Sequence, residues 1–495
     1  MAFFDPHLLE RRLAALAPPQ REVLLGREDA GSPLEVFPYL GAYNQWSRRL
    51  RPLGAARGRP RLKTLLAEPW RIDCKKLYVH IPFCRSRCLY CGFFMRRWNP
   101  VEVEDYLELL ERELSLVSRY PWVAGSDFDA VYLGGGTPSD LEPHQLSRLL
   151  EAVRRHLPLK PGAEITLEGR LLGFDRARRQ AALAGGVNRF SFGVQTFDDE
   201  LRSMLGRRLG RQELKRLLGQ LRQELEAPVA IDLIYGLPGQ GATLWERDLE
   251  DFVDCGLAGL SLYALRMVQH NPLDLAIKGG LLPPEADTPT QGALALQAAR
   301  RLEAAGFQRL DLIHWRSTPD ERCLYELRLK GRSAILGLGW GSHSELKGLR
   351  LVNHLKPAAY AALVRRGRLP VMLYLAHPEQ YPLYHEIHDQ LCRGSLRLKD
   401  LGEGLAGMLE PFCRRWCRLG LMEAKGEHYR LTEAGWFFGP NLIQSLLDLL
   451  DMAAPDYRVP APSAAPRHFS LYLKPPSTTR RRKPSSPCGG EASHV

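Results

Sequence analysis

Three closely spaced cysteines, Cys84, Cys88 and Cys91, are the residues of this sequence best suited to do chemistry. They follow the pattern C-x3-C-x2-C inside the stretch YVHIPFCRSRCLYCGFF at residues 78–94. Three thiolates on one short loop can each hold one iron of a cubane 4Fe–4S cluster, which normally takes four cysteines. The fourth iron would then stay open to a small molecule. Structural zinc sites instead need four ligands in two pairs, and no second pair lies nearby.

A glycine-rich segment, GGGTPS at residues 134–139, follows the next apolar run. Glycines let a backbone approach a ligand closely, because there is no Cβ in the way. On its own the segment could be a tight turn in which Ser139 caps a helix. Its position one strand–helix unit after the cysteines favours a loop that hydrogen-bonds a ligand beside the cluster.

Polar residues also mark the ends of later apolar runs. Glu168 and Gln195 end the third and fourth runs, and Asp232 lies within the fifth. An acidic residue at a strand end can hold ribose hydroxyls. Arg207 could make a bidentate pair with a carboxylate. Each residue alone could make an ordinary loop hydrogen bond, but their shared face favours a common binding site.

The elements that position these residues form a regular alternation of strands and helices. Strands are predicted at 77–81, 130–134, 164–168, 189–194, 229–235 and 260–265. Helices are predicted at 103–118, 145–156, 175–184, 198–205, 212–225 and 243–255. Strand–helix repeats favour an α/β fold with a parallel sheet, and six units suit an open, partial (β/α)6 barrel. The polar residues then fall at the C-terminal ends of the strands, the face that carries active sites in barrel enzymes.

Four regions are predicted along the chain. Residues 1–75 form an N-terminal extension without a usable motif, and residues 76–375 form the barrel, with an irregular part at 306–346 that covers its open side. Residues 376–452 read as helices, two short strands and a helix, which is typical of a winged-helix-like domain. Such domains often bind DNA, but a fold alone proves no function. Residues 453–495 are rich in proline, serine and arginine and are predicted to be disordered.

The composition is that of a globular enzyme. The chain has 495 residues, enough for two or three domains, and 45% of them are hydrophobic. Its 10 cysteines are scattered, which favours a reducing compartment, and we expect a cytoplasmic protein without a signal peptide or membrane span. The net charge of +12 could attract a propionate-bearing tetrapyrrole or a nucleic acid, or reflect solvated arginines. We do not expect nucleic-acid binding.

Taken together, the motifs resemble the radical S-adenosylmethionine (SAM) family of oxygen-independent coproporphyrinogen III dehydrogenase. The shared segments are YVHIPFC-x3-C-x2-C, GGGTPS, ITLE, NRFSFGVQTFD and DLIYGLPGQ, within residues 76–265, with a weaker match to about residue 450. The resemblance implies a radical SAM barrel with a 4Fe–4S cluster on the three cysteines and two SAM molecules. The residues it places at the first SAM are Tyr78, Gly135 and Glu168. Those it places at the second are Tyr90, Gly136, Thr137, Gln195, Arg207 and Asp232, with Ala264 nearby.

Three subgroups of this family differ at recognisable positions. The coproporphyrinogen dehydrogenases usually carry an extra cysteine where this chain has Phe93. The heme chaperones of the family have an aspartate where this chain has Gly92, and an HN-x2-YW motif where it reads ERCLY at residues 321–325. Both differences point away from those two subgroups.

The third subgroup comprises the anaerobic heme-utilisation methyltransferases. The chain is similar to them at CGFF (91–94), TLEGR (166–170), LYAL (262–265) and the stretch from His314 to Tyr325. It departs from them at GWGSH (339–343), where a smaller Gly/Ala loop is expected.

This resemblance implies an enzyme that acts on heme. We expect methyl transfer with opening of the porphyrin ring and release of iron, driven by a flavodoxin-like or flavoprotein electron donor. The alternatives are a heme chaperone and a coproporphyrinogen III dehydrogenase. His314 and His343 could ligate heme iron, or could be ordinary hydrogen-bonded histidines. The sequence identifies no further catalytic residue.

Overall fold

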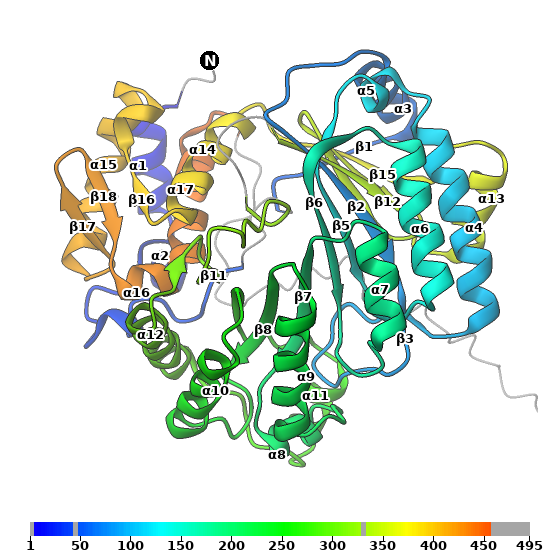
Figure 1. Ribbon diagram of the computed structural model, residues 1–495. Helices are drawn as coiled ribbons and strands as arrows, with labels where there is room; N and C mark the ends of the chain where they lie inside the picture. The colour runs from blue at the N-terminus through cyan, green and yellow to red at the C-terminus, as the bar shows by residue number, and fades with distance from the viewer. Residues whose placement is uncertain (1–3, 43–47, 328–332, 457–495) are drawn as a thin grey trace, which may run out of the picture.

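The protein is built around one large, mostly parallel β-sheet. The computed structural model describes residues 4–42, 48–327 and 333–456. Within them, six neighbouring strands run parallel in the middle of a 13-stranded sheet (Figure 1). These strands are β2 (Cys74–Ile81), β5 (Phe128–Gly135), β6 (Leu159–Gly169), β7 (Arg189–Gln195), β8 (Val229–Tyr235) and β9 (Gly259–Ala264). They confirm the predicted partial barrel of six strand–helix units.

Alternation along each strand separates a core face from an inner face. In β2, Leu77, Val79 and Ile81 are completely buried, whereas Tyr78 is partly accessible on the opposite face. The helices that follow the strands cover the core face and bury apolar side chains against it (Figure 1). They are α4 (Pro100–Val117), α6 (Pro143–His156), α7 (Arg176–Ala184), α8 (Asp199–Met204), α9 (Arg211–Glu224) and α10 (Ala242–Cys255).

The segment expected to cover the open side of the barrel extends both edges of the sheet. Strand β12 (Ser333–Leu338) pairs in parallel with β2, and β11 (His314–Arg316) pairs antiparallel with β9 and with β10 (Gln308–Arg309). Beyond β12 the strands are antiparallel, in the order β13 (His343–Leu346), β14 (Leu349–Asn353), β15 (Val371–Ala376) and β1 (Arg51–Leu53). Helices α3 (Ala55–Ala67), α5 (Pro121–Ala124) and α13 (Pro357–Arg365) pack around this edge.

The C-terminal region is helical, with the expected small β-wing. Its helices are α14 (Tyr381–Cys392), α15 (Glu403–Arg418), α16 (Glu433–Phe437) and α17 (Gly439–Ala453). Its strands, β16 (Ser395–Leu396), β17 (Met422–Lys425) and β18 (His428–Leu431), form one three-stranded sheet. Helix α14 ends at Cys392, and the chain turns at Gly394, which has φ 78°.

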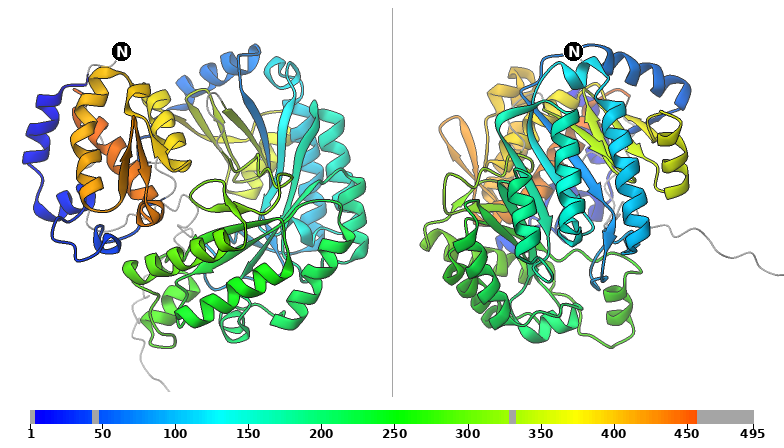
Figure 2. Two further views of the ribbon diagram at one scale, coloured as in Figure 1. Left: turned by 60° about the vertical axis from the view of Figure 1, so that its left-hand side comes forward. Right: turned by 45° about the vertical axis from the view of Figure 1, so that its right-hand side comes forward.

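Residues 4–42 pack mainly against the C-terminal helices, and their Pro33–Glu35 turn also contacts helix α12 (Thr288–Ala304). Helices α1 (Pro6–Ala14) and α2 (Pro18–Leu25) contact α17, as the blue and orange helices of Figure 2 show. The Asn441 side chain accepts from Gly41 N at 2.6 Å and donates to the Tyr39 carbonyl at 2.9 Å. Arg266, just after β9, donates to the Leu40 and Gly41 carbonyls. This segment therefore joins the C-terminal region to the barrel.

No helix in the described ranges combines the length and the apolar character needed to cross a lipid bilayer. The predicted disordered tail lies almost entirely outside the described residues, from position 457 onward. The nine cysteines that the structure describes are all free thiols.

Candidate active site

The cysteine loop lies at the C-terminal end of the barrel strands. Cys84 ends β3 (Phe83–Cys84), which pairs with β4 (Arg96–Arg97). The loop between them is tied to its neighbours by main-chain bonds of Leu89, which donates to Leu205 O at 3.3 Å and accepts from Leu273 N at 3.2 Å. Asn271 donates to the Tyr90 carbonyl at 3.1 Å. The loop is thus held between α8 and α11 (Pro272–Lys278).

The three thiols share one electrostatic environment. Burial, with smaller contributions from the charges of Cys91 and Cys88, raises the pKa of Cys84 to about 12. Two hydrogen bonds favour thiolates: Thr137 Oγ1 donates to Cys84 Sγ at 3.2 Å, and Phe93 N donates to Cys91 Sγ at 3.3 Å. Positive irons would supply the charge that the site needs to deprotonate its thiols.

The donor set fits a cluster better than a single ion. No three His, Cys, Asp or Glu side chains in the described ranges converge on one metal position. A cubane cluster does not need such convergence, because each thiolate holds a different iron. Three cysteines would leave the fourth iron of the cluster open to the amino and carboxylate groups of SAM.

The GGGTPS loop is fixed against the cysteine strand by its backbone. Gly136 N donates to Ile81 O at 2.7 Å, and Thr137 N donates to Phe83 O at 2.8 Å. A Cβ on Gly136 would lie 2.6 Å from the Phe83 carbonyl oxygen, and one on Gly135, which has φ 113°, would lie 2.5 Å from the His80 ring. Only glycines allow this close approach, which places the loop beside Cys84.

The residues predicted for the first SAM gather next to this loop. Gly135 N donates to Glu168 Oε2 at 3.4 Å, and Tyr132 hydrogen-bonds the same carboxyl group. Burial and the Asp232 carboxylate raise the pKa of Glu168 to about 8. Tyr78 lies on the adjacent strand, with its hydroxyl 2.9 Å from His80 Nδ1. A nearby cation would therefore stabilise the carboxylate form of this partly accessible side chain.

Most residues predicted for the second SAM form a neighbouring group. Arg207 donates to the Tyr90 hydroxyl at 2.9 Å and to the Gly193 carbonyl at 2.6 Å, while its buried Nε has no partner in the described residues. Gln195 ends β7 with φ 75°, and its Nε2 lies 2.6 Å from where a Cβ of Gly193 would be. The amide and the guanidinium therefore meet above Gly193.

Two further predicted residues lie on the strands furthest from β2 in the six-stranded parallel part of the sheet. Asp232 lies on β8, and Ala264 ends β9. Asp232 accepts a hydrogen bond from Ser261, and burial raises its pKa. The Ala264 methyl group packs into the hydrophobic core, so only its main chain can line the site. Of the predicted site residues, Ala264 is the one whose side chain the structure directs away.

The inner face also contains aromatic residues that were not predicted as site residues from the sequence. Tyr325 stacks on Tyr132 with ring centroids 4.6 Å apart, and Tyr78 lies 6.0 Å from Tyr325. Tyr263 follows Ser261 by two positions on β9 and so shares its face. Alternation along β5 and β9 could have predicted Tyr132 and Tyr263. The position of Tyr325, which comes from a loop, had no local signal.

Both candidate histidines lie near this inner face. His314 pairs in register with Ser261, which pairs with Asp232, so the three side chains share one face. Its Nδ1 lies 2.9 Å from Asp311 Oδ1, and its Nε2 is buried without a partner in the described residues. Burial opposes protonation, but Asp311 raises the pKa of His314 to about 9. The His343 ring lies 6.3 Å from the Tyr78 ring.

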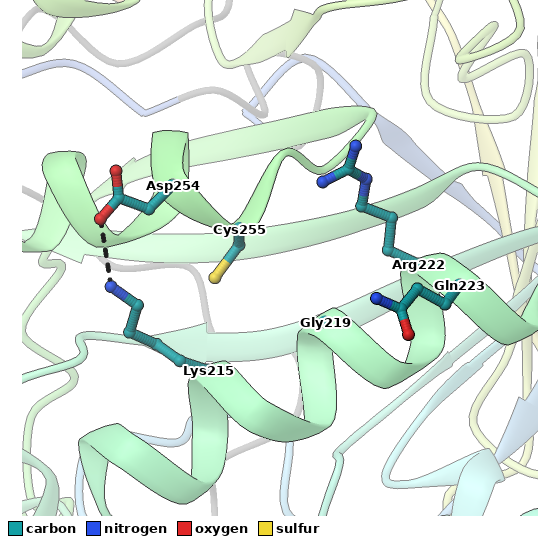
Figure 3. Close-up of a pocket in the computed structure, with 6 residues that line it drawn as sticks. All are labelled: Lys215, Gly219, Arg222, Gln223, Asp254 and Cys255. Carbon is teal, nitrogen blue, oxygen red and sulfur yellow. Dashed lines mark hydrogen bonds and ion pairs between the residues drawn. The ribbon is translucent and has the colours of Figure 1, made fainter.

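A separate surface cavity of about 440 Å³ lies between α9 and α10, on the outside of the barrel (Figure 3). Lys215 and Asp254 pair across it, with Lys215 Nζ 3.2 Å from Asp254 Oδ2. Burial raises the pKa of Cys255 to about 11, which keeps this thiol protonated. None of the predicted site residues lines this cavity, so it is not part of the candidate site.

The fold and the cysteine site agree with comparisons to known proteins. Residues 78–252 match the model of the radical SAM superfamily. The chain is also 33% identical to the anaerobilin synthase of Escherichia coli O157:H7 over 404 residues, covering 79% of this chain and 90% of that protein. The chain therefore belongs to the radical SAM superfamily. Membership implies a 4Fe–4S cluster and SAM as cofactors.

Further relatives lie within the same superfamily. The heme chaperone HemW of Escherichia coli strain K12 is 31% identical over 54% of this chain and 70% of its own length. The HemW of Synechocystis is 32% identical over 55% and 66%. The solved radical SAM enzyme coproporphyrinogen III oxidase from Escherichia coli shares the fold, with a TM-score of 0.69 and 22% identity over 81% of this chain and 95% of that one. The protein is thus a radical SAM enzyme related to anaerobilin synthase and HemW.

Proposed function

We propose that this protein is a radical SAM methyltransferase that acts on heme, transferring a methyl group, opening the porphyrin ring and releasing iron. The observation that carries the proposal is the pairing of two adjacent groups of ligand-binding residues beside one cysteine loop. One group is built around Glu168 and the other around Arg207. Two SAM molecules are what a methyl transfer begun by a radical requires: one as the radical source and one as the methyl donor.

The residues of the first group would bind and orient the SAM at the cluster. When bound, a reduced 4Fe–4S cluster and SAM supply a 5′-deoxyadenosyl radical. Cys84, Cys88 and Cys91 would hold the cluster, and the backbone of Gly135 and the Glu168 carboxylate would receive the ammonium group and ribose. A cation beside Glu168 would lower its raised pKa and stabilise the carboxylate.

The residues of the second group would hold the methyl-donating SAM. Beside its bonds to Gly193 and Tyr90, Arg207 keeps an Nε donor without a partner in the described residues, and this donor suits a carboxylate. Gln195, Thr137 and the Gly136 backbone would complete the contacts, and Asp232 would accept from a ribose hydroxyl. The two SAM molecules would then lie side by side at one end of the barrel.

The relatives support a tetrapyrrole as the substrate. The related proteins are named for anaerobilin synthesis and for heme binding as a chaperone. On the aromatic inner face, the partly accessible rings of Tyr78 and Tyr325 offer apolar surface for a flat macrocycle. A flavodoxin-like or flavoprotein donor would supply electrons to the cluster.

Heme carriage is the second candidate, because HemW relatives cover half of the chain. Phe93 and Gly92 still favour methyl transfer over coproporphyrinogen oxidation and heme carriage, since the resemblance assigns other residues to those two activities. The two alternatives differ from the proposal in their products, so one experiment separates all three.

The test is incubation of the anaerobically reconstituted protein with heme, SAM and dithionite under nitrogen. The proposal expects bleaching of the Soret band, free iron, and formation of 5′-deoxyadenosine and S-adenosylhomocysteine together. Cys91→Ala is the matched control and should form none of these products. S-adenosylhomocysteine is the discriminating product, because the oxidation of coproporphyrinogen consumes SAM without transferring its methyl group.

Two outcomes would contradict the proposal. Heme that is bound unchanged and handed to an apo-acceptor would establish the chaperone function. Consumption of coproporphyrinogen with release of carbon dioxide, and without S-adenosylhomocysteine, would establish the dehydrogenase function.

A further inference from the structure

The outer side of the cysteine loop carries several exposed arginines. Arg87 lies within the loop, between Cys84 and Cys88, and Arg97 is the register partner of Cys84. Arg208 follows the turn at Gly206, where a Cβ would lie 3.4 Å from Leu89 Cδ1 and 3.7 Å from the Arg87 carbonyl. These three arginines come from separate segments that the fold brings to one face.

The positive charge of these arginines is not neutralised. Across residues 4–42, 48–327 and 333–456, no ion pair involves Arg87, Arg97 or Arg208. Their neighbours Arg85 and Arg96 are paired, Arg85 with Glu142 at 2.7 Å and Arg96 with Glu102 at 2.5 Å. Arg87 and Arg97 beside the cysteines, and Arg208 on the neighbouring segment, therefore keep positive charges that can attract an acidic partner.

An exposed aromatic ring lies on the same loop as Arg87, between β3 and β4. Phe93 is 69% exposed, and its main-chain N donates to Cys91 Sγ at 3.3 Å. Large apolar side chains surrounded by charged residues are typical of protein interfaces. Phe93 lies two positions after Cys91, a predicted cluster ligand, so a molecule seated on its ring lies close to the cluster position.

We propose that this surface, which we call the cluster face and define by Arg87, Phe93, Arg97 and Arg208, is the docking site of an acidic protein that carries single electrons on a flavin. The inference rests on the proposed function, because the radical chemistry needs a reduced cluster. In the docked complex the flavin loses one electron and the cluster gains one. Complementary charge would speed the encounter, and Phe93 would fill the centre of the interface.

The test uses charge reversal with a matched control on the full-length chain. The variant carries Arg87→Glu, Arg97→Glu and Arg208→Glu. The control carries Arg57→Glu, Arg59→Glu and Lys63→Glu, exposed positions on α3 at the opposite end of the sheet from β3 (Figure 1). Both variants change the net charge by the same amount. A bacterial flavodoxin, which is acidic, is the probe, and dithionite is the small reductant for comparison.

Two quantities are measured at low and high salt. The first is the Kd of flavodoxin for each protein by titration calorimetry, which does not depend on activity. The second is the rate of SAM cleavage without heme, driven either by reduced flavodoxin or by dithionite. We expect the cluster-face variant to bind flavodoxin roughly tenfold or more weakly and to lose its flavodoxin-driven rate, while its dithionite-driven rate is unchanged. The wild-type affinity for flavodoxin should fall as salt rises.

Equal flavodoxin affinity in the cluster-face variant and the control would overturn the proposal. If the charge reversal damages the cluster, the dithionite-driven rate falls too. A variant with the same three arginines changed to glutamine then takes the place of the charge-reversal variant. Phe93→Ala should also weaken binding without changing the dithionite-driven rate. A cluster face that binds flavodoxin while heme stays intact would refute the heme chemistry but not the docking site, so the two failures are distinguishable.

Discussion

The Arg207 guanidinium donates to the Tyr90 hydroxyl at 2.9 Å, which joins the segment after α8 to the cysteine loop. Tyr90 accepts this bond, and no described residue accepts its own hydroxyl proton. Burial raises the pKa of Tyr90, so the phenol stays protonated. Arg207 Nε–H is likewise unpaired in the described residues. The pair therefore offers two donors to one ligand, the arrangement that a carboxylate accepts.

The first prediction concerns this pair. Arg207→Ala should reduce the number of SAM molecules bound per chain from two to one, because it removes the charged partner of the second carboxylate. Tyr90→Phe should weaken the second site by about tenfold, the effect of one hydrogen bond to a charged group. Equilibrium dialysis with labelled SAM counts the sites. A single site in the reconstituted wild type would contradict both the assignment and the methyl-transfer mechanism.

The second prediction concerns the cluster ligands. Cys84→Ala, Cys88→Ala or Cys91→Ala should each remove the 4Fe–4S absorbance and all SAM cleavage, because three protein ligands are already one fewer than a cluster normally has. Anaerobic reconstitution followed by iron analysis and visible spectroscopy checks the result.

Its control is the double change Cys413→Ala and Cys417→Ala on α15. Cys413 is completely buried there and belongs to the hydrophobic core. The double variant should lose about 1 kcal/mol of unfolding free energy but keep its cluster and its SAM cleavage. Loss of the cluster in this variant, with retention in Cys91→Ala, would mean that the ligands are assigned wrongly.

The third prediction concerns the pH dependence of Glu168. Burial first, and then Asp232, raise its pKa from the ordinary 4.5 to about 8. Between these values the folded protein keeps a proton that the unfolded chain has released, so rising pH lowers stability across this window. Glu168→Gln removes the titration. In the absence of SAM it should therefore be more stable than wild type by about 1–2 kcal/mol near pH 8, with little difference near pH 5.

SAM binding should have the opposite pH dependence to stability and become stronger as pH rises. The ammonium group favours the Glu168 carboxylate, so binding near pH 7 should release a proton, and affinity should rise with pH up to about 8. Calorimetry in buffers of different ionisation enthalpy measures the proton. Release of the same proton by Glu168→Gln would assign it to another group.

The fourth prediction concerns the glycine loop. Gly136→Ala places a Cβ 2.6 Å from the Phe83 carbonyl oxygen and 2.8 Å from the Ile81 carbonyl oxygen, two backbone atoms that cannot move independently. We expect the free energy of unfolding to fall by about 1–3 kcal/mol. We also expect Cys84 to be displaced and the cluster to be bound more weakly. Gly219→Ala on α9 is the control, since nothing lies within 4 Å of its Cβ position. It should be neutral or stabilise the protein by up to about 1 kcal/mol. Chemical denaturation of both variants compares them, and equal stability would contradict the contact.

The barrel could be predicted because its strands carry local signals. The predicted strand 229–235 coincides with β8, where an apolar run ends at a turn-forming glycine. The prediction for β6 began five residues late, at 164 rather than Leu159. The missed residues include Pro161 and Gly162, which do not favour strands and lie in a bulge between the positions of β6 that pair with β5, Leu159 and Glu164.

The parts that could not be predicted depend on contacts between distant segments. Glu113 on α4 is buried and accepts from Gly339 N at 2.8 Å, from Asn353 at 3.0 Å and from Tyr360 at 2.7 Å. Burial raises the pKa of Glu113 to about 7. This network fixes the GWGSH loop, yet the sequence near Glu113 reads as an ordinary helix. Because one sequence carries no record of pairing, such contacts appear only once the fold is known.

The contacts between the N-terminal segment and α17 have a consequence for how the chain folds during its synthesis. Gly41 and Asn441 are 400 residues apart, and Arg49 Nε binds Asp451 at 2.6 Å across 402 residues. A ribosome releases residues in chain order, so Gly41 and Arg49 must wait until α17 has been synthesised. We expect the barrel to form during synthesis while residues 4–42 still lack their partners on α17. The contacts that join the C-terminal region to the barrel would then be among the last to form.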